Sequence, residues 1–137
     1  MALSNGITQP VVGYGEKNAT KVVFNAAAVA TTGLTLNAQT VLVRVPAGFT
    51  VTGMSVASTD MDTGTTLVFA VGDALSNTRL ASGLNIGQAG GISHVALLAT
   101  GFGYRFPTDT DVILTATTAA TGATAGTFTI ALYGSLD

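Results

Sequence analysis

Short runs of alternating apolar and polar residues, each closed by a turn, constrain this chain more than any other feature. Three such runs follow one another within residues 41–72. In the first run, valine recurs at every second position from Val41 to Val45, and Pro46 ends it because proline cannot donate a ladder hydrogen bond. This alternation is typical of half-buried β-strands. The segment is therefore predicted to form three consecutive strands, a β-meander.

The second of these runs carries the sequence signature of a β-bulge. Phe49 and Val51 share one face of an alternating strand, but after Gly53 the apolar phase slips by one residue, to Met54 and Val56. One extra residue in a strand produces such a slip, because it turns the following side chains to the opposite face. We expect a bulge near Gly53.

Further short strands are predicted on both sides of this segment. They are Thr20–Ala28, Gly103–Pro107, Val112–Thr117 and Thr127–Leu132. The last two are expected to pair as an antiparallel hairpin. The polar connection at residues 73–77 has room for one helical turn. Residues 92–99 are interpreted as a loop, with a short helix or an edge strand left open.

About eight short strands, separated by Gly, Asp and Pro turns and without a long amphipathic helix, predict an all-β protein. The expected fold is an antiparallel β-sandwich of the jelly-roll type. The 137-residue length fits one domain, which we place at residues 18–137.

Residues 1–17 precede this domain as an extended N-terminal segment. Ile7, Val11, Val12 and Tyr14 make the segment too apolar for a solvated tail. It is interpreted either as an edge strand on its own domain or as an arm that lies across a neighbouring subunit. An arm of this kind binds by strand addition, through main-chain hydrogen bonds and pockets for alternate side chains.

The chain is poor in charge. Charged residues make up 9% of the sequence, against about 25% in ordinary soluble domains. So few charges give weak colloidal protection near the isoelectric point of about 5.0. We infer that partners cover much of the exterior.

Composition also argues against several function classes. The five Lys and Arg residues are scattered and the net charge is −2, so the basic patch that direct nucleic-acid binding needs is missing. No run of about 20 apolar residues is present to span a membrane. The absence of cysteine excludes disulfides and thiol nucleophiles.

Candidate catalytic residues are few. His94 is the single histidine, with Ser93 beside it, and nothing in the pattern places an acid near its ring. Asp109 and Asp111 form a carboxylate pair, but such a pair before a strand more often closes a turn or protects an edge. We expect no catalytic site, no cofactor and no enzyme activity.

Asp60 and Asp62 are weak candidates for metal ligands. With Gly64 they reproduce the start of a calcium-loop spacing, in which oxygen ligands recur at alternate positions. The full motif needs a later bidentate Glu, and Val71 occupies that position. The alternative is a turn whose Asp side chains accept hydrogen bonds from backbone amides.

Segment order and turn phrases resemble a group of small tailed-bacteriophage virion proteins, the capsid decoration or cement proteins. The resemblance covers roughly residues 40–134 and lies in these phrases: VPAGFTVTGMSV, DMDTG, TTLVFAVGD, RLASGLNIGQAGG, LLATGFGYRFPTDTDVILTATTAA and AGTFTIALYG. It implies a β-sandwich, made in the host cytoplasm, that binds the outside of a capsid and contacts the major capsid protein.

The same resemblance implies self-association, with a trimer as the expected oligomer. Contacts to the capsid or another partner are predicted for Ile7, Val11, Val12 and Tyr14. The alternative function is a carbohydrate-binding head-fibre or tail module that contacts the host surface, because jelly rolls often carry such sites.

Overall fold

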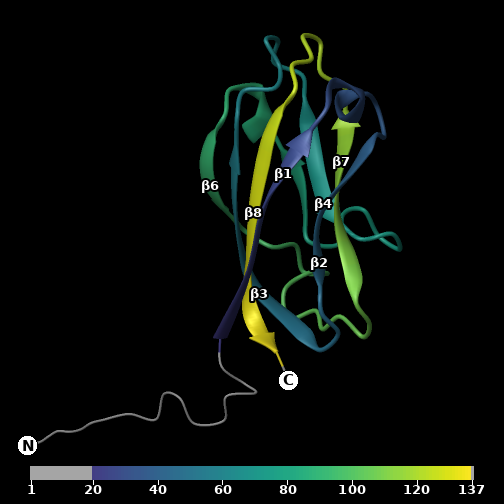
Figure 1. Ribbon diagram of the computed structural model, residues 1–137, viewed down its shortest axis with the longest axis vertical. Helices are drawn as coiled ribbons and strands as arrows, with labels where there is room; N and C mark the ends of the chain where they lie inside the picture. The colour runs from purple at the N-terminus through teal and green to yellow at the C-terminus, as the bar shows by residue number, and fades with distance from the viewer. Residues whose placement is uncertain (1–19, 137) are drawn as a thin grey trace, which may run out of the picture.

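The computed structural model describes residues 20–136, which form two four-stranded antiparallel sheets packed face to face (Figure 1). The strands are β1 (Thr20–Val29), β2 (Gln39–Val45), β3 (Phe49–Ser58), β4 (Val68–Gly72), β5 (Ala81–Leu84), β6 (Gly91–Val95), β7 (Thr110–Thr118) and β8 (Gly126–Leu136). Two single 3-10 turns, η2 (Thr31–Leu34) and η3 (Ile86–Gln88), connect β1 to β2 and β5 to β6.

The strand order is that of a jelly roll. One sheet has the order β1-β8-β3-β6 and the other the order β2-β7-β4-β5, and all neighbouring strands are antiparallel. Strands that follow one another in the chain mostly lie in opposite sheets, as two interleaved Greek keys require. The predicted all-β sandwich of jelly-roll type is confirmed.

Two predicted strand pairings are wrong. β2 and β4 lie in one sheet and β3 in the other, so residues 41–72 form no meander. β7 pairs with β2 and β4, and β8 pairs with β1 and β3, so the predicted final hairpin is absent. An alternating pattern shows which face of a strand is buried, but it carries no information about the neighbouring strand.

The core lies between the inner faces of the two sheets. Phe69 on β4 and Phe128 on β8 meet edge to face across it, with ring centroids 5.6 Å apart. Both rings are fully buried. The other large, fully buried side chains are Phe49, Phe106, Leu34, Leu42, Met61, Leu67, Leu80, Leu114, Ile130 and Leu132.

The predicted bulge in β3 is present. The pairing of β3 with β8 shifts between Val51 and Gly53, and this shift allows both Val51 and Met54 to face the core. A second bulge, which the sequence pattern did not predict, lies in β2 between Val41 and Val43. Because of it, Leu42 and Val45 are both buried while Val41 is 55% exposed, so the three valines do not share one face.

The structure also shows the form of the connections at residues 73–77 and 92–99. Residues 73–77 form a turn without a helical residue, because Asp73 accepts the amides of Leu75 and Ser76 and pairs with Arg79. Within residues 92–99, interpreted as a loop with an edge strand left open, the chain continues the edge strand β6 as far as Val95. An edge strand pairs on one side only, and β6 is mostly exposed, so it lacks the apolar alternation of a buried strand.

Removal of the Phe128 ring tests the contact between the sheets. We expect Phe128→Ala to lower the free energy of unfolding by about 3–5 kcal/mol, since it leaves a cavity opposite Phe69. Phe24→Ala, on an exposed ring, is the matched control and should change it by about 0.5 kcal/mol or less. Urea unfolding of both variants measures the difference, and equal effects would contradict this account of the core.

Candidate functional site

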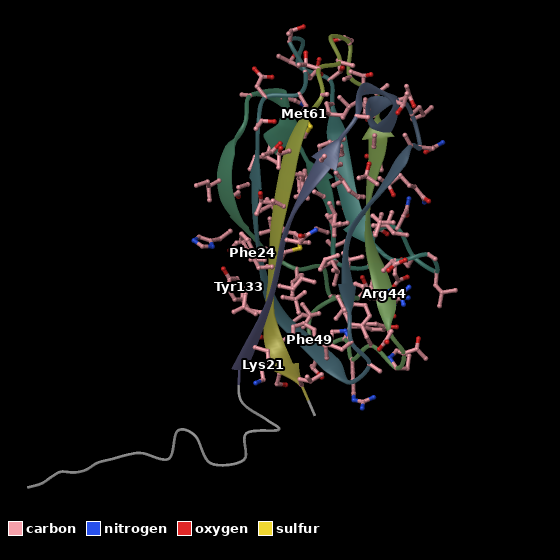
Figure 2. The ribbon with its side chains drawn as sticks, in the orientation of Figure 1. Lys21, Phe24, Arg44, Phe49, Met61 and Tyr133 are labelled. Atoms are coloured by element: carbon pink, nitrogen blue, oxygen red, sulfur yellow. The ribbon has the colours of Figure 1, made fainter. Side chains whose placement is uncertain are left out.

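The outer face of the β1-β8-β3-β6 sheet carries an exposed apolar surface. Phe24 is 66% exposed on β1, and Ile92 is 82% exposed on β6. Tyr133 of β8 lies near Phe24 on this side, while Arg44 lies on the other side of the molecule (Figure 2). The surface encloses a shallow cavity of about 230 Å³ lined by Phe24, Ser55, Val56, Ala57, Ile92, His94, Thr129, Ala131 and Tyr133. We call it the outer-face cavity.

A hydrogen-bonded chain crosses the outer-face cavity from β8 to β6. The Tyr133 hydroxyl donates to Ser55 Oγ at 3.3 Å, and Ser55 Oγ lies 2.6 Å from His94 Nδ1. The strand register produces this alignment, because His94 is the cross-strand partner of Ser55 on β3. The sequence pattern missed it: Ser93, next to His94 in the chain, projects to the opposite face of β6.

Hydrogen bonding and ring contact are the chemistry that these groups can supply. No Asp or Glu lines the outer-face cavity to orient the imidazole, so Ser55 and His94 lack the third member of a catalytic triad. Ser55 and His94 are partner residues of the β3–β6 ladder. Two aromatic rings with a few hydroxyls make a binding surface.

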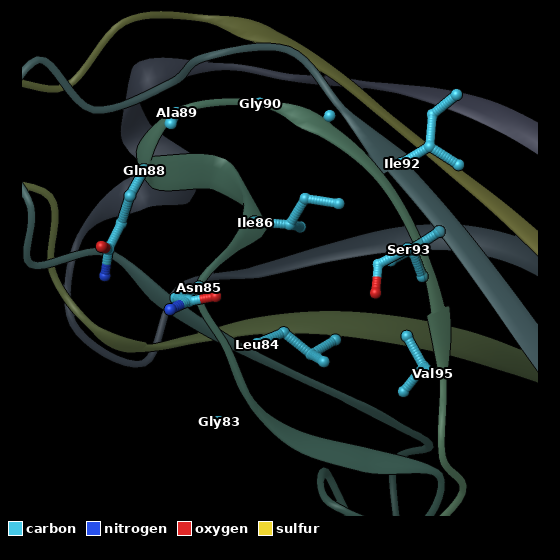
Figure 3. A pocket seen from close by; sticks show the side chains of 12 residues that line it. Gly83, Leu84, Asn85, Ile86, Gln88, Ala89, Gly90, Ile92, Ser93 and Val95 are labelled. Carbon is cyan, nitrogen blue, oxygen red and sulfur yellow. The ribbon is translucent and has the colours of Figure 1, made fainter.

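A second cavity lies between the edge strands β5 and β6. It measures about 390 Å³, and we call it the open-side groove. Leu84, Ile86 and Val95 project into it, and Ser93 lies on its β6 wall (Figure 3). The complete lining is Val56, Gly83, Leu84, Asn85, Ile86, Gln88, Ala89, Gly90, Gly91, Ile92, Ser93 and Val95. No charged side chain contributes to it.

Asp62 is buried and ties two loops together. Its carboxylate accepts hydrogen bonds from the amides of Gly64 (2.8 Å), Leu67 (2.9 Å) and Gly122 (2.9 Å), and also from the amide of Thr66. Burial alone would raise the pKa of Asp62, but these hydrogen bonds outweigh burial and hold the pKa well below its usual range. The carboxylate thus joins the β3–β4 and β7–β8 loops.

The other candidate carboxylates have backbone or ion-pair partners. Asp60 accepts the amide of Asp62, which is the turn-capping alternative to a metal site. Asp109 accepts the amide of Ala47, and Asp111 pairs with Arg44 across the β2–β7 ladder. Across residues 20–136, no three His, Asp or Glu side chains are grouped as metal ligands.

The predicted contact residues Ile7, Val11, Val12 and Tyr14 lie outside the described residues. Their role stays a prediction. Within residues 20–136, no helix has the length and apolar character needed to cross a membrane.

The chain shares its fold with proteins in solved phage capsids. One chain of the cyanophage Pam1 capsid asymmetric unit superimposes over 100% of both chains, with a TM-score of 0.76 and 23% identity. A chain of the Ralstonia phage GP4 capsid matches 85% of each chain, with a TM-score of 0.67 and 19% identity.

A third match is to a chain of the acid-stable capsid of the Helicobacter pylori bacteriophage KHP30. It covers 84% of this chain and 92% of that one, with a TM-score of 0.57 and 15% identity. No family model and no curated protein matches the sequence. At these identities the comparisons establish a common fold.

Asp62 makes folding stability depend on pH. An unfolded Asp has a pKa of about 3.9, and the folded-state pKa is lower, so the unfolded chain binds more protons in acid. The stabilisation is therefore complete above about pH 5 and is lost as pH falls below about 4. We expect Asp62→Asn to lower Tm by several degrees at pH 7, and the difference from wild type to shrink towards pH 2.

Thermal melts followed by circular dichroism measure this dependence. Asp60→Asn is the matched control, because exposed Asp60 accepts a single amide. A pH-independent difference between Asp62→Asn and wild type would contradict the role of the charged carboxylate.

Proposed function

We propose that this chain is a structural virion protein that binds the outer surface of a phage capsid and reinforces contacts between major capsid protein subunits. The observation that carries the proposal is the match, over the full length of both chains, to a protein within the Pam1 capsid asymmetric unit. The GP4 and KHP30 matches support the same class of assembly.

The physical properties of the surface fit such a role. Large apolar side chains on several elements, among them Phe24, Leu75, Ile92 and Phe102, are exposed in the isolated chain. Exposed apolar side chains add no stability to a solvated monomer, whereas an assembly that buries them gains hydrophobic stabilisation. A protein that binds only the assembled lattice stabilises it by mass action, and many copies make modest contacts sufficient.

The proposal includes the partners, the oligomeric state, the location and the contact residues of the protein. The expected partners are the major capsid protein and further copies of this chain, with a trimer as the oligomer and the virion exterior as the location. Ile7, Val11, Val12 and Tyr14 supply apolar contacts to the lattice or to a neighbouring copy. The protein acts by adhesion and has no enzymatic activity.

Capsid binding tests the proposed function directly. Purified protein is mixed with capsids of the parent phage that lack it, and co-sedimentation and capsid melting are measured. We expect binding and a higher capsid melting temperature. Deletion of residues 1–17 should weaken binding by about tenfold or more, equivalent to about 1.4 kcal/mol. Full-length protein that stays in the supernatant would overturn the proposal.

The outer-face cavity favours one second candidate, a carbohydrate-binding module. Phe24 and Tyr133 offer ring faces for a sugar, and Ser55 and His94 offer hydrogen-bonding groups. Glycan-array binding that Tyr133→Ala and His94→Ala abolish would support this function. Binding to no glycan, together with binding to capsids, would exclude it.

A further inference from the structure

The two long sides of the sandwich differ. On one side β1 packs along β2, and Asn25 Nδ2 donates a hydrogen bond to the Leu42 carbonyl at 2.5 Å. On the other side β5 and β6 end their sheets, and the open-side groove separates them. The sandwich is thus closed along β1 and β2 and open along β5 and β6.

The free edge of β6 has no lysine, proline or bulge to protect it from pairing. Exposed edges commonly carry lysine, proline or a bulge, because unpaired backbone groups invite another strand. Gly91–Val95 contains neither lysine nor proline, and its pairing with β3 is regular. No other strand of residues 20–136 pairs with β6. This edge can therefore accept an added strand.

Cavities lie on both faces of this edge. Ser93 and Val95 border the open-side groove on the inner face, and Ile92 and His94 border the outer-face cavity. Successive side chains of an added strand point to opposite faces, so one would enter the groove and the next would cover the outer face. Strand addition binds in this way, with backbone pairing along the edge and alternate side chains in pockets.

The chain itself contains a segment with suitable chemistry. Residues 1–15 carry no charged side chain, and the lining of the open-side groove carries none either. In a strand, the adjacent residues Val11 and Val12 would place apolar side chains on opposite faces of the sheet. Pro10 is compatible with this position, because an added strand would be an edge strand and proline is tolerated there. Docking would therefore bury no unpaired charge.

We propose that the N-terminal segment around Val11 and Val12 of one copy adds as a strand to the β6 edge of a second copy. One valine enters the open-side groove, and the other covers the outer face beside His94. The inference relies on the proposed function only in that many copies lie side by side on a lattice. It assigns the surface that receives the segment, and so names a neighbouring copy as its partner.

Distance favours a second copy over the chain's own β6. Thr20 pairs with Ser135 at one end of the sheet, whereas Ser93 lies at the level of Val56, which is also the level of Asn25. Thr20 is thus five residues along the strand and three strand spacings across from Ser93. At the usual strand rise and spacing, the separation is about 22 Å.

Val12 lies eight residues before Thr20, a reach of about 27 Å when fully extended. Docking on its own domain would stretch residues 13–19 almost straight over the sheet. Glu16 and Lys17 would then lie on the apolar outer face without partners. A second copy imposes no such path.

Engineered disulfides test the docking, because the chain has no natural cysteine. Four single variants are made: Val11→Cys, Val12→Cys, Ser93→Cys and His94→Cys. Each N-terminal variant is mixed with each β6 variant under mild oxidation, in solution and on capsids. Cross-linked dimers should form in alternation: one valine position links to Ser93→Cys and the other to His94→Cys, because strand neighbours face opposite sides.

Leu75→Cys is the control acceptor, since its side chain is 89% exposed and lies on the β4–β5 connection. Cross-linking to Leu75→Cys as strong as to the β6 positions would overturn the docking. Two double variants, Val12→Cys/Ser93→Cys and Val12→Cys/His94→Cys, test docking on the same chain, and a disulfide within one chain in either would also overturn the proposal. The absence of any cross-linked dimer, both in solution and on capsids, would overturn it as well.

The two proposals fail separately. Capsid binding by full-length protein without cross-links would reject the β6 docking and leave the virion role standing. Alternating cross-links in solution without capsid binding would support the β6 docking and reject the virion role. Melting curves of the Ser93→Cys and His94→Cys variants, both at exposed positions, verify that the fold is intact.

Discussion

Burial of two apolar sheet faces against each other is the constraint on which the rest of this structure depends. The core holds few aromatic rings, and the edge-to-face contact of Phe69 with Phe128 spans it from sheet to sheet. The bulges in β2 and β3 serve the same burial, because each turns one further apolar side chain inward. The two sheets thereby present continuous apolar faces to each other despite irregular strands.

Polar groups support this sandwich at its ends. Asp62 accepts amides from the β3–β4 and β7–β8 loops, both of which cross between the sheets, and so fixes their positions relative to each other. At another connection Asp73 binds the amides of its own turn and pairs with Arg79. Asp62, which the sequence offers as a candidate metal ligand, thus organises the backbone of two loops. A charged group that accepts several amides is stabilised in its ionised form, which suits a structural role.

Two exposed surfaces are the candidate functional features of this structure. The outer face around Phe24 and the open side along β6 are both apolar, uncharged and accessible within the described residues. One is a flat sheet face and the other is an edge with a groove, so they suit different kinds of contact. Both surfaces suit contacts with other molecules, and the proteins that share this fold come from phage capsids.

The amino-acid sequence by itself determined the all-β class, most strand positions, the bulge near Gly53 and the low charge, because alternation, turn residues and composition are local properties. Only the tertiary structure decided which strands pair, and therefore that Ser55, 39 residues away, meets His94, or that Asp62 reaches Gly122. Pairing depends on contacts between residues far apart in the chain, and similar alternating strands leave many pairings open. The edge strand β6 was only one of the alternatives left open by the sequence for a related reason: one free edge and an exposed face leave little pattern in the sequence.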